Sequence, residues 1–232
     1  MKIVFAAAIT AAGFATTSDA AVLKLDGFTS SVQSVSVTAS PDANTPGRVG
    51  ATGFNLTDTT GDMGSFVGWC LDTAHYVMEK GDSQNYTLTD APFSNSFSLT
   101  NTARDRVQSV FDANYALIDV SNGDQAAAFQ MALWEAAYED DNAAMSVSSG
   151  LFQASSTGST ALANQYLLAA ANYADGGQWN LSFLEVDGDA NRGRYSGQNL
   201  VTVSPVPVPA AGLLLVTGLL GMGAITRRRR KA

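Results

Sequence analysis

The chain has 232 residues, with 13 basic and 21 acidic side chains and a formal net charge of −8. Hydrophobic residues make up 46%, enough to bury a core, which excludes wholesale disorder. The one cysteine excludes an internal disulfide and a multi-cysteine zinc site, and the one histidine excludes a histidine-rich metal centre. The acidic balance argues against a nucleic-acid binder, which needs cations to neutralise phosphates.

Residues 1–20 have the organisation of a secretory signal peptide. A basic residue near the start precedes an apolar run at residues 3–14, which is too short to span a membrane. Ser18 and Ala20 are the small residues that a signal peptidase requires. We therefore expect cleavage before Ala21 and export of the mature chain, with a retained membrane anchor as the alternative.

The expected exported body, residues 21–205, begins with segments typical of strands. Polar and apolar residues alternate over residues 34–39, as in a half-buried strand, and turn residues fill residues 40–48. We predict five strands in this half of the body, at residues 21–25, 34–39, 50–56, 66–71 and 86–89.

The middle of the body has helical periodicity. A helix over residues 101–118 would place Leu117 on the same apolar face as the earlier large hydrophobic residues. The strongest helix is predicted at residues 124–139, which are rich in alanine and contain no Gly, Pro or β-branched residue. Asn122 or Asp124 can cap its start.

The rest of the body returns to strands. The Ser, Thr and Gly content of residues 146–160 indicates a loop, and a third helix is predicted at residues 160–173. Two more strands are expected at residues 179–186 and 199–203. The order of elements predicts an α+β fold, an antiparallel β-sandwich or barrel with an inserted helical subdomain. An N-terminal signal peptide and a C-terminal transmembrane sorting helix would flank it.

Residues 206–232 also have three parts. The first is a short motif of Val206, Pro207, Val208, Pro209 and Ala210. Residues 210–226 carry no charge and would form a helix of about 25 Å, slightly short for a bilayer core of about 30 Å. The last part is a cluster of cations that the positive-inside rule keeps in the cytoplasm: Arg227, Arg228, Arg229, Arg230 and Lys231. A buried core helix with a solvated basic end is the alternative.

This C-terminal arrangement resembles the PEP-CTERM sorting signal, in the VPLPA variant of alphaproteobacteria. The resemblance implies cleavage by an exosortase, after signal peptidase has acted, in a Gram-negative host that makes exopolysaccharide. It also implies an inner-membrane-anchored precursor and a final location at the cell surface or in the extracellular matrix. Residues 21–205 retain 7 basic and 20 acidic side chains, a formal net charge of −13, which favours solubility of an exported domain.

Two residues of the body invite a chemical interpretation. Cys70 lies in an apolar strand segment, so we expect it to be buried, either as a small hydrophobic residue or as a functional thiol. Gln130 lies on the apolar face of the strongest predicted helix, beside Leu133 and Trp134. A buried carboxamide without partners costs about 1–3 kcal/mol. Periodicity favours an ordinary core glutamine that is hydrogen-bonded to backbone.

The sequence motifs around these two residues resemble those of the thioester domain of bacterial surface adhesins. An aromatic residue precedes the cysteine in Trp69-Cys70, and a helix sixty residues later carries hydrophobic-Gln-x-x-hydrophobic-Trp. The matching residues of that helix are Phe129, Gln130, Leu133 and Trp134. The resemblance implies an internal thioester between Cys70 and Gln130, which Trp69 and Trp134 would shield from water. It would capture an amine on a surface or matrix partner once, without enzymatic turnover.

A weaker motif suggests a calcium-binding loop. Asp187, Asp189 and Asn191 resemble the start of a calcium loop, but Arg192 and Gln198 stand where an EF-hand loop has glycine and glutamate. A polar turn between two strands is the better interpretation. We therefore expect no cofactor, with calcium as the alternative.

The other titratable residues give little indication of a catalytic site. His75 lies five residues after Cys70, and a surface or loop histidine is favoured over a cysteine hydrolase. Glu135 and Glu139 lie one helical turn apart, a spacing that an acid pair and a solvated helix face explain equally well. The leading hypothesis is an exported, non-enzymatic attachment protein. The alternatives are a passive matrix protein of the same fold that binds exopolysaccharide, and a carbohydrate or cysteine hydrolase.

Overall fold

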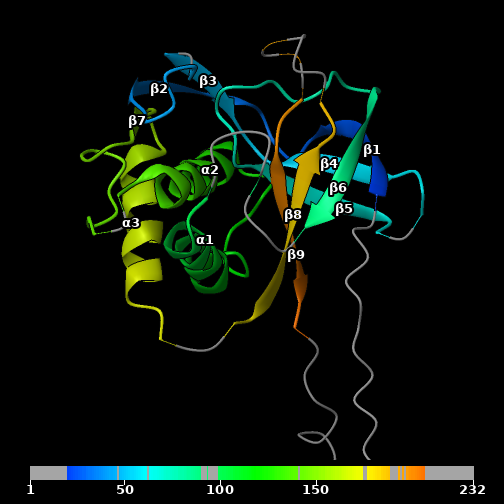
Figure 1. Ribbon diagram of the computed structural model, residues 1–232. Helices are drawn as coiled ribbons and strands as arrows, with labels where there is room; N and C mark the ends of the chain where they lie inside the picture. The colour runs from blue at the N-terminus through cyan, green and yellow to red at the C-terminus, as the bar shows by residue number, and fades with distance from the viewer. Residues whose placement is uncertain are drawn as a thin grey trace, which may run out of the picture.

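Six antiparallel strands close into a barrel in the spatial order β1-β4-β5-β9-β8-β6 (Figure 1). The computed structural model describes residues 20–206, apart from residues 46, 62, 90–92, 94–98, 141, 175–176, 189–192, 194 and 196. The barrel strands are β1 (Ala20–Phe28), β4 (Phe54–Asp58), β5 (Ser65–Cys70), β6 (Ser83–Thr89), β8 (Trp179–Val186) and β9 (Leu200–Pro205). Of the two predicted architectures, the sandwich and the barrel, the protein adopts the barrel.

A second sheet of three strands has the order β3 (Arg48–Ala51), β2 (Gln33–Ala39) and β7 (Gln153–Ser155). The single strand predicted over residues 50–56 is wrong, because its two halves belong to different sheets. The chain passes between the sheets at Gly53, where a Cβ would meet the side chains of Thr29 and Trp69 at 3.0–3.2 Å. A glycine is needed at this close approach.

Three helices are inserted between β6 and β8, which pair with each other in the barrel. They are α1 (Asn101–Asn114), α2 (Gly123–Tyr138) and α3 (Thr160–Ala171). Figure 1 shows them together on one side of the barrel, with the small sheet beside them. The predicted helical insertion is therefore confirmed.

Helix α2 is the centre of this inserted layer. Each of residues 126–138 is buried, because the helix packs against both other helices and against strands of both sheets. The predicted capping at its start is confirmed for Asn122, whose Oδ1 accepts hydrogen bonds from the backbone of Asp124 and Gln125.

Two predicted segments differ from the structure. Helix α1 ends at Asn114, whose side chain donates to the carbonyl oxygens of Val110 and Tyr166. Leu117 follows that end and is 81% exposed, so it does not belong to the apolar face. The loop expected at residues 146–160 contains the short strand β7, which exists through its pairing with β2.

The terminal segments fall largely outside the described residues. Residues 1–19 of the expected signal peptide are not described. Its last residue, Ala20, begins strand β1 and pairs with Thr87. The sorting motif after Val206, the apolar segment and the cation cluster are likewise not described. Within the described part of the chain, no helix has the length and hydropathy of a membrane span.

Candidate functional site

Strand β5 ends at Cys70 and carries two neighbouring site residues to opposite sides. Trp69 pairs with Val201 and Cys70 with Leu200 of β9, and successive side chains of a strand alternate in direction. Trp69 is fully buried and packs edge-on against Phe129, with ring centroids 4.8 Å apart. Cys70 is a buried free thiol on the other side.

Gln130 of α2 is fully buried and pairs with the backbone of Cys70 in both directions. The Cys70 amide donates to Gln130 Oε1 at 2.9 Å, and Gln130 Nε2 donates to the Cys70 carbonyl oxygen at 2.7 Å. The glutamine is thus bonded to backbone, as its periodicity predicted, and the backbone belongs to the cysteine. These two bonds hold the amide carbon of Gln130 against the residue that carries the sulfur.

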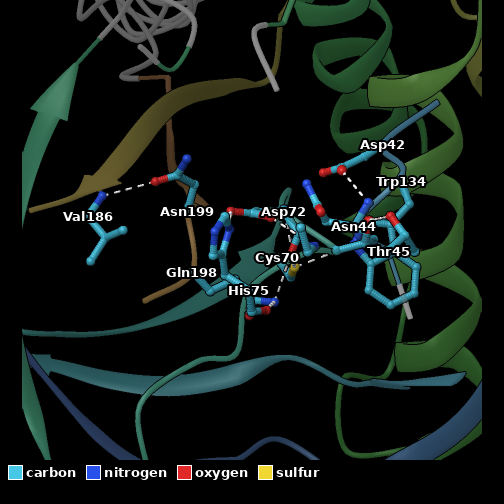
Figure 2. A network of polar contacts seen from close by, with 12 residues as sticks. Asp42, Asn44, Thr45, Cys70, Asp72, His75, Trp134, Val186, Gln198 and Asn199 are labelled. Carbon is cyan, nitrogen blue, oxygen red and sulfur yellow. Dashed lines mark hydrogen bonds and ion pairs between the residues drawn. The ribbon is translucent and has the colours of Figure 1, made fainter. Parts of the chain in front are cut away.

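The sulfur of Cys70 makes three hydrogen bonds, two with the backbone of Asp72 and one with Trp134 (Figure 2). The thiol donates to the Asp72 carbonyl oxygen at 2.9 Å. It accepts from the Asp72 backbone amide at 3.3 Å and from the Trp134 indole N–H at 3.4 Å. Burial, and next the negative charge of Asp72, raises the pKa of the Cys70 thiol well above its ordinary value.

The four residues expected to support the site have separate places in the structure. Trp134 touches the sulfur, and it is 1% exposed. Trp69 and Phe129 lie in an aromatic cluster that continues to Phe111, which joins β5 to α1 and α2. Leu133 is buried in the core. The structure therefore brings Trp134 to Cys70, whereas Trp69 and Phe129 join the strand to the helices.

A histidine–aspartate pair adjoins the site, and the sequence analysis missed it. His75 Nδ1 lies 2.6 Å from Asp72 Oδ2, with side chains that are 28% and 3% exposed. The Asp72 Oδ1 accepts from the Ala74 amide, which fixes the carboxylate. His75 follows β5 in a loop, as expected, but it is partly buried and held in place. The Cys70-x-Asp72-x-x-His75 spacing is the signal that could have indicated this pair.

A pocket of about 210 Å³ opens beside these residues. Its lining is largely apolar and includes Phe28, Val32 and Trp134, with polar groups from His75 and Gln198. The Gln198 side chain donates to the carbonyl oxygens of Asp72 and His75. The pocket therefore shares Trp134, His75 and Gln198 with the surroundings of Cys70.

The acid pair on α2 is buried, so the predicted solvated helix face is wrong. Glu135 is 0% and Glu139 5% exposed, because the segment after α2 folds back over them. Ser146 donates its amide to Glu135 at 2.6 Å, and Leu151 donates to Glu139 at 2.9 Å. Burial raises the pKa of Glu135 to about 8.

The possible calcium loop is only partly described. Asp187 follows β8 and accepts a hydrogen bond from Thr87 at 3.2 Å. Asp189 and Asn191 lie outside the described residues. Within the described ranges, no group of three or more His, Cys, Asp or Glu side chains is arranged to hold a metal ion.

Comparisons with known protein families and with curated proteins found no match. Among solved structures, the chain is similar to the N-terminal domain of the Streptococcus pyogenes pilus tip adhesin Cpa. The identity is 16% and the TM-score 0.39, over 77% of this chain and 97% of that one. It is also similar to the N-terminal thioester domain of a surface protein from Clostridium perfringens. There the identity is 13% and the TM-score 0.44, over 76% and 100% of the two chains.

Proposed function

We propose that the protein is an exported attachment protein in which Cys70 and Gln130 form an internal thioester. The reciprocal hydrogen bonding between the Gln130 carboxamide and the Cys70 backbone is the observation that carries this proposal. It holds the side-chain carbonyl group of Gln130 against the residue that carries the thiol, in a buried arrangement that would lower the entropic cost of attack.

Formation of the bond balances without a further reactant. The Cys70 sulfur attacks the side-chain carbonyl carbon of Gln130, and the C–N bond breaks. The thiol proton passes to the departing nitrogen, which leaves as ammonia. The Cys70 amide already donates to Gln130 Oε1, where negative charge develops during the attack. The N–H groups of Asp72 and Trp134 favour a negative sulfur, whereas burial opposes it.

The thioester would be consumed in one binding event. An amine on a surface or matrix component attacks the Gln130 carbonyl carbon and forms an amide. Cys70 leaves and regains a proton as a free thiol. The protein is not regenerated, so we propose attachment rather than enzymatic turnover.

A passive matrix protein of the same fold is the second candidate. It is favoured by the pairing of the Gln130 amide, whose oxygen and nitrogen each have a backbone partner. Such a pairing stabilises the contact between β5 and α2 without any covalent bond. The protein would then adhere to exopolysaccharide through ordinary contacts.

The intact mass of the purified chain separates the two candidates. With a thioester, the wild type is lighter than its sequence by one ammonia, whereas Cys70→Ala and Gln130→Ala have their full masses. Methylamine then adds to Gln130 and frees one titratable thiol. A wild type at full mass, with Cys70 reactive only after unfolding, contradicts the thioester and leaves the passive candidate.

We further propose that the chain ends direct its location. The support is the signal-like residues 1–20 and the sorting-like residues 206–232. Signal peptidase and an exosortase would process the precursor at the inner membrane of a Gram-negative host, and the body would reach the surface or matrix. Deleting Val206–Ala210 should leave a precursor that keeps its C-terminal segment and stays in the membrane fraction. Normal release of that variant would contradict the proposal.

A further inference from the structure

The pocket and the sulfur of Cys70 share one neighbouring side chain, that of Trp134. Trp134 lines the pocket of about 210 Å³, and its indole N–H donates to the Cys70 sulfur at 3.4 Å. His75 lines the same pocket. A small molecule in this pocket therefore contacts a residue on the sulfur and lies beside an imidazole.

The contact with Asp72 sets which nitrogen of His75 is basic. A carboxylate can only accept a hydrogen bond, so the Nδ1 that lies 2.6 Å from Asp72 Oδ2 carries a hydrogen. The lone pair of the neutral ring is then on Nε2. Asp72 is itself 2% exposed and held by the Ala74 amide, so it fixes the orientation of the ring. An imidazole oriented by a buried carboxylate is the arrangement of a general base.

We infer that His75, oriented by Asp72, takes the proton from the amine that opens the thioester. This inference rests on the proposed function. The amine nitrogen bonds to the Gln130 carbonyl carbon and passes one proton to His75 Nε2, and the C–S bond breaks. The Cys70 thiolate then recovers a proton, which His75 can return. His75 is the catalytic residue of this capture and Asp72 is its positioning residue.

The pocket also carries features that suit an entering amine. Gln198 is 8% exposed, and its Oε1 is buried without a hydrogen-bond partner among the described residues. It is an acceptor that an N–H group at the pocket can satisfy. Phe28 and Tyr76, which are 42% and 45% exposed, line the same pocket and offer apolar surface to the stem of a primary alkyl amine.

Two small nucleophiles test the role of His75 in the full chain. Each attacks as the neutral amine and then has to lose one proton from its nitrogen. Methylamine is the stronger base, so its adduct holds that proton more firmly than the hydroxylamine adduct and depends more on a protein base. His75→Gln should slow methylamine capture about 10²-fold and hydroxylamine capture less than about 10-fold. Intact mass before each reaction shows that the variant has folded and formed its thioester. Lys80→Gln, an exposed change a few residues later, is the control and should leave both rates unchanged.

The possible results separate the role of His75 from the existence of the thioester. Equal slowing of both nucleophiles by His75→Gln would mean that the residue acts only structurally, and it would overturn the inference. An unchanged methylamine rate would also overturn it. A wild type that has no thioester removes the proposed function and this inference together. Asp72→Asn should reproduce the selective loss if the carboxylate orients the ring.

Discussion

Helix α2 buries two polar side chains five residues apart, and their surroundings differ. The amide of Gln130 is neutral, and its oxygen and nitrogen are matched by the backbone of Cys70. The carboxyl of Glu135 accepts from Ser146 through one oxygen, while Oε2 has no hydrogen-bond partner among the described residues. A matched amide is held in one orientation at little net cost. A buried acid costs free energy whenever it ionises.

The largest effect on stability is expected when the side-chain amide of Gln130 is removed. Gln130→Ala leaves the amide and carbonyl of Cys70 unpaired and opens a cavity, so it should lower the free energy of unfolding by about 4 kcal/mol. Urea unfolding of a Cys70→Ala background measures the packing effect without the thioester. Gln125→Ala, the same truncation near the start of α2, should cost far less. Equal losses would mean that the pairing contributes nothing special.

The buried carboxyl of Glu135 should make the free energy of unfolding depend on pH. Its folded pKa of about 8 exceeds the ordinary value of 4.5, so between these values the folded state binds a proton that the unfolded chain has released. The stabilisation is complete below about pH 4.5 and is lost as pH rises to about 8, a total of roughly 5 kcal/mol. Glu135→Gln should remove this dependence, as measured by urea unfolding from acidic to alkaline pH. Stability curves that stay parallel to wild type would contradict the buried acid. Glu79→Gln, an exposed change, is the control.

The end of α2 near this acid is held by Arg106 of α1. Its guanidinium donates to the carbonyl oxygens of Ala136, Glu139 and Asp140 at 2.7–3.0 Å, where the helix has no partners of its own. Arg106→Met should cost about 2 kcal/mol in thermal or urea unfolding. Arg104→Met on the same helix should be nearly neutral. A larger loss from Arg104→Met would place the important contact elsewhere.

The smallest expected effect compares two helix starts. Asn122 caps α2 through two backbone amides, whereas Ser159 makes no side-chain cap at α3 and its buried hydroxyl has no hydrogen-bond partner among the described residues. Asn122→Ala should cost about 1 kcal/mol, and Ser159→Ala should cost nothing or stabilise slightly. Calorimetry of both variants measures the difference. A greater loss at Ser159 would reverse the assignment of caps.

Much of the secondary structure follows from local pattern. The alternation in β2, the alanine-rich helix α2 and the Asn122 cap were predicted close to their observed places. The division of residues 50–56 between two sheets was not, because it depends on Trp69 approaching Gly53 from another strand. The short strand β7 was missed for the same kind of reason, since its pairing partner lies more than a hundred residues away.

The candidate site divides in the same way. Residue order alone predicted that Cys70 would lie in a buried strand and that Gln130 would face the core, because periods of two and 3.6 residues are local properties. The resemblance to thioester domains implied that Gln130 and Cys70 meet, and the tertiary structure decided that Gln130 pairs with the Cys70 backbone. It also decided that Glu135 is covered and that His75 meets both Asp72 and a pocket. Each of these depends on which segments of the folded chain lie side by side, and burial, charge and reactivity are set by those neighbours.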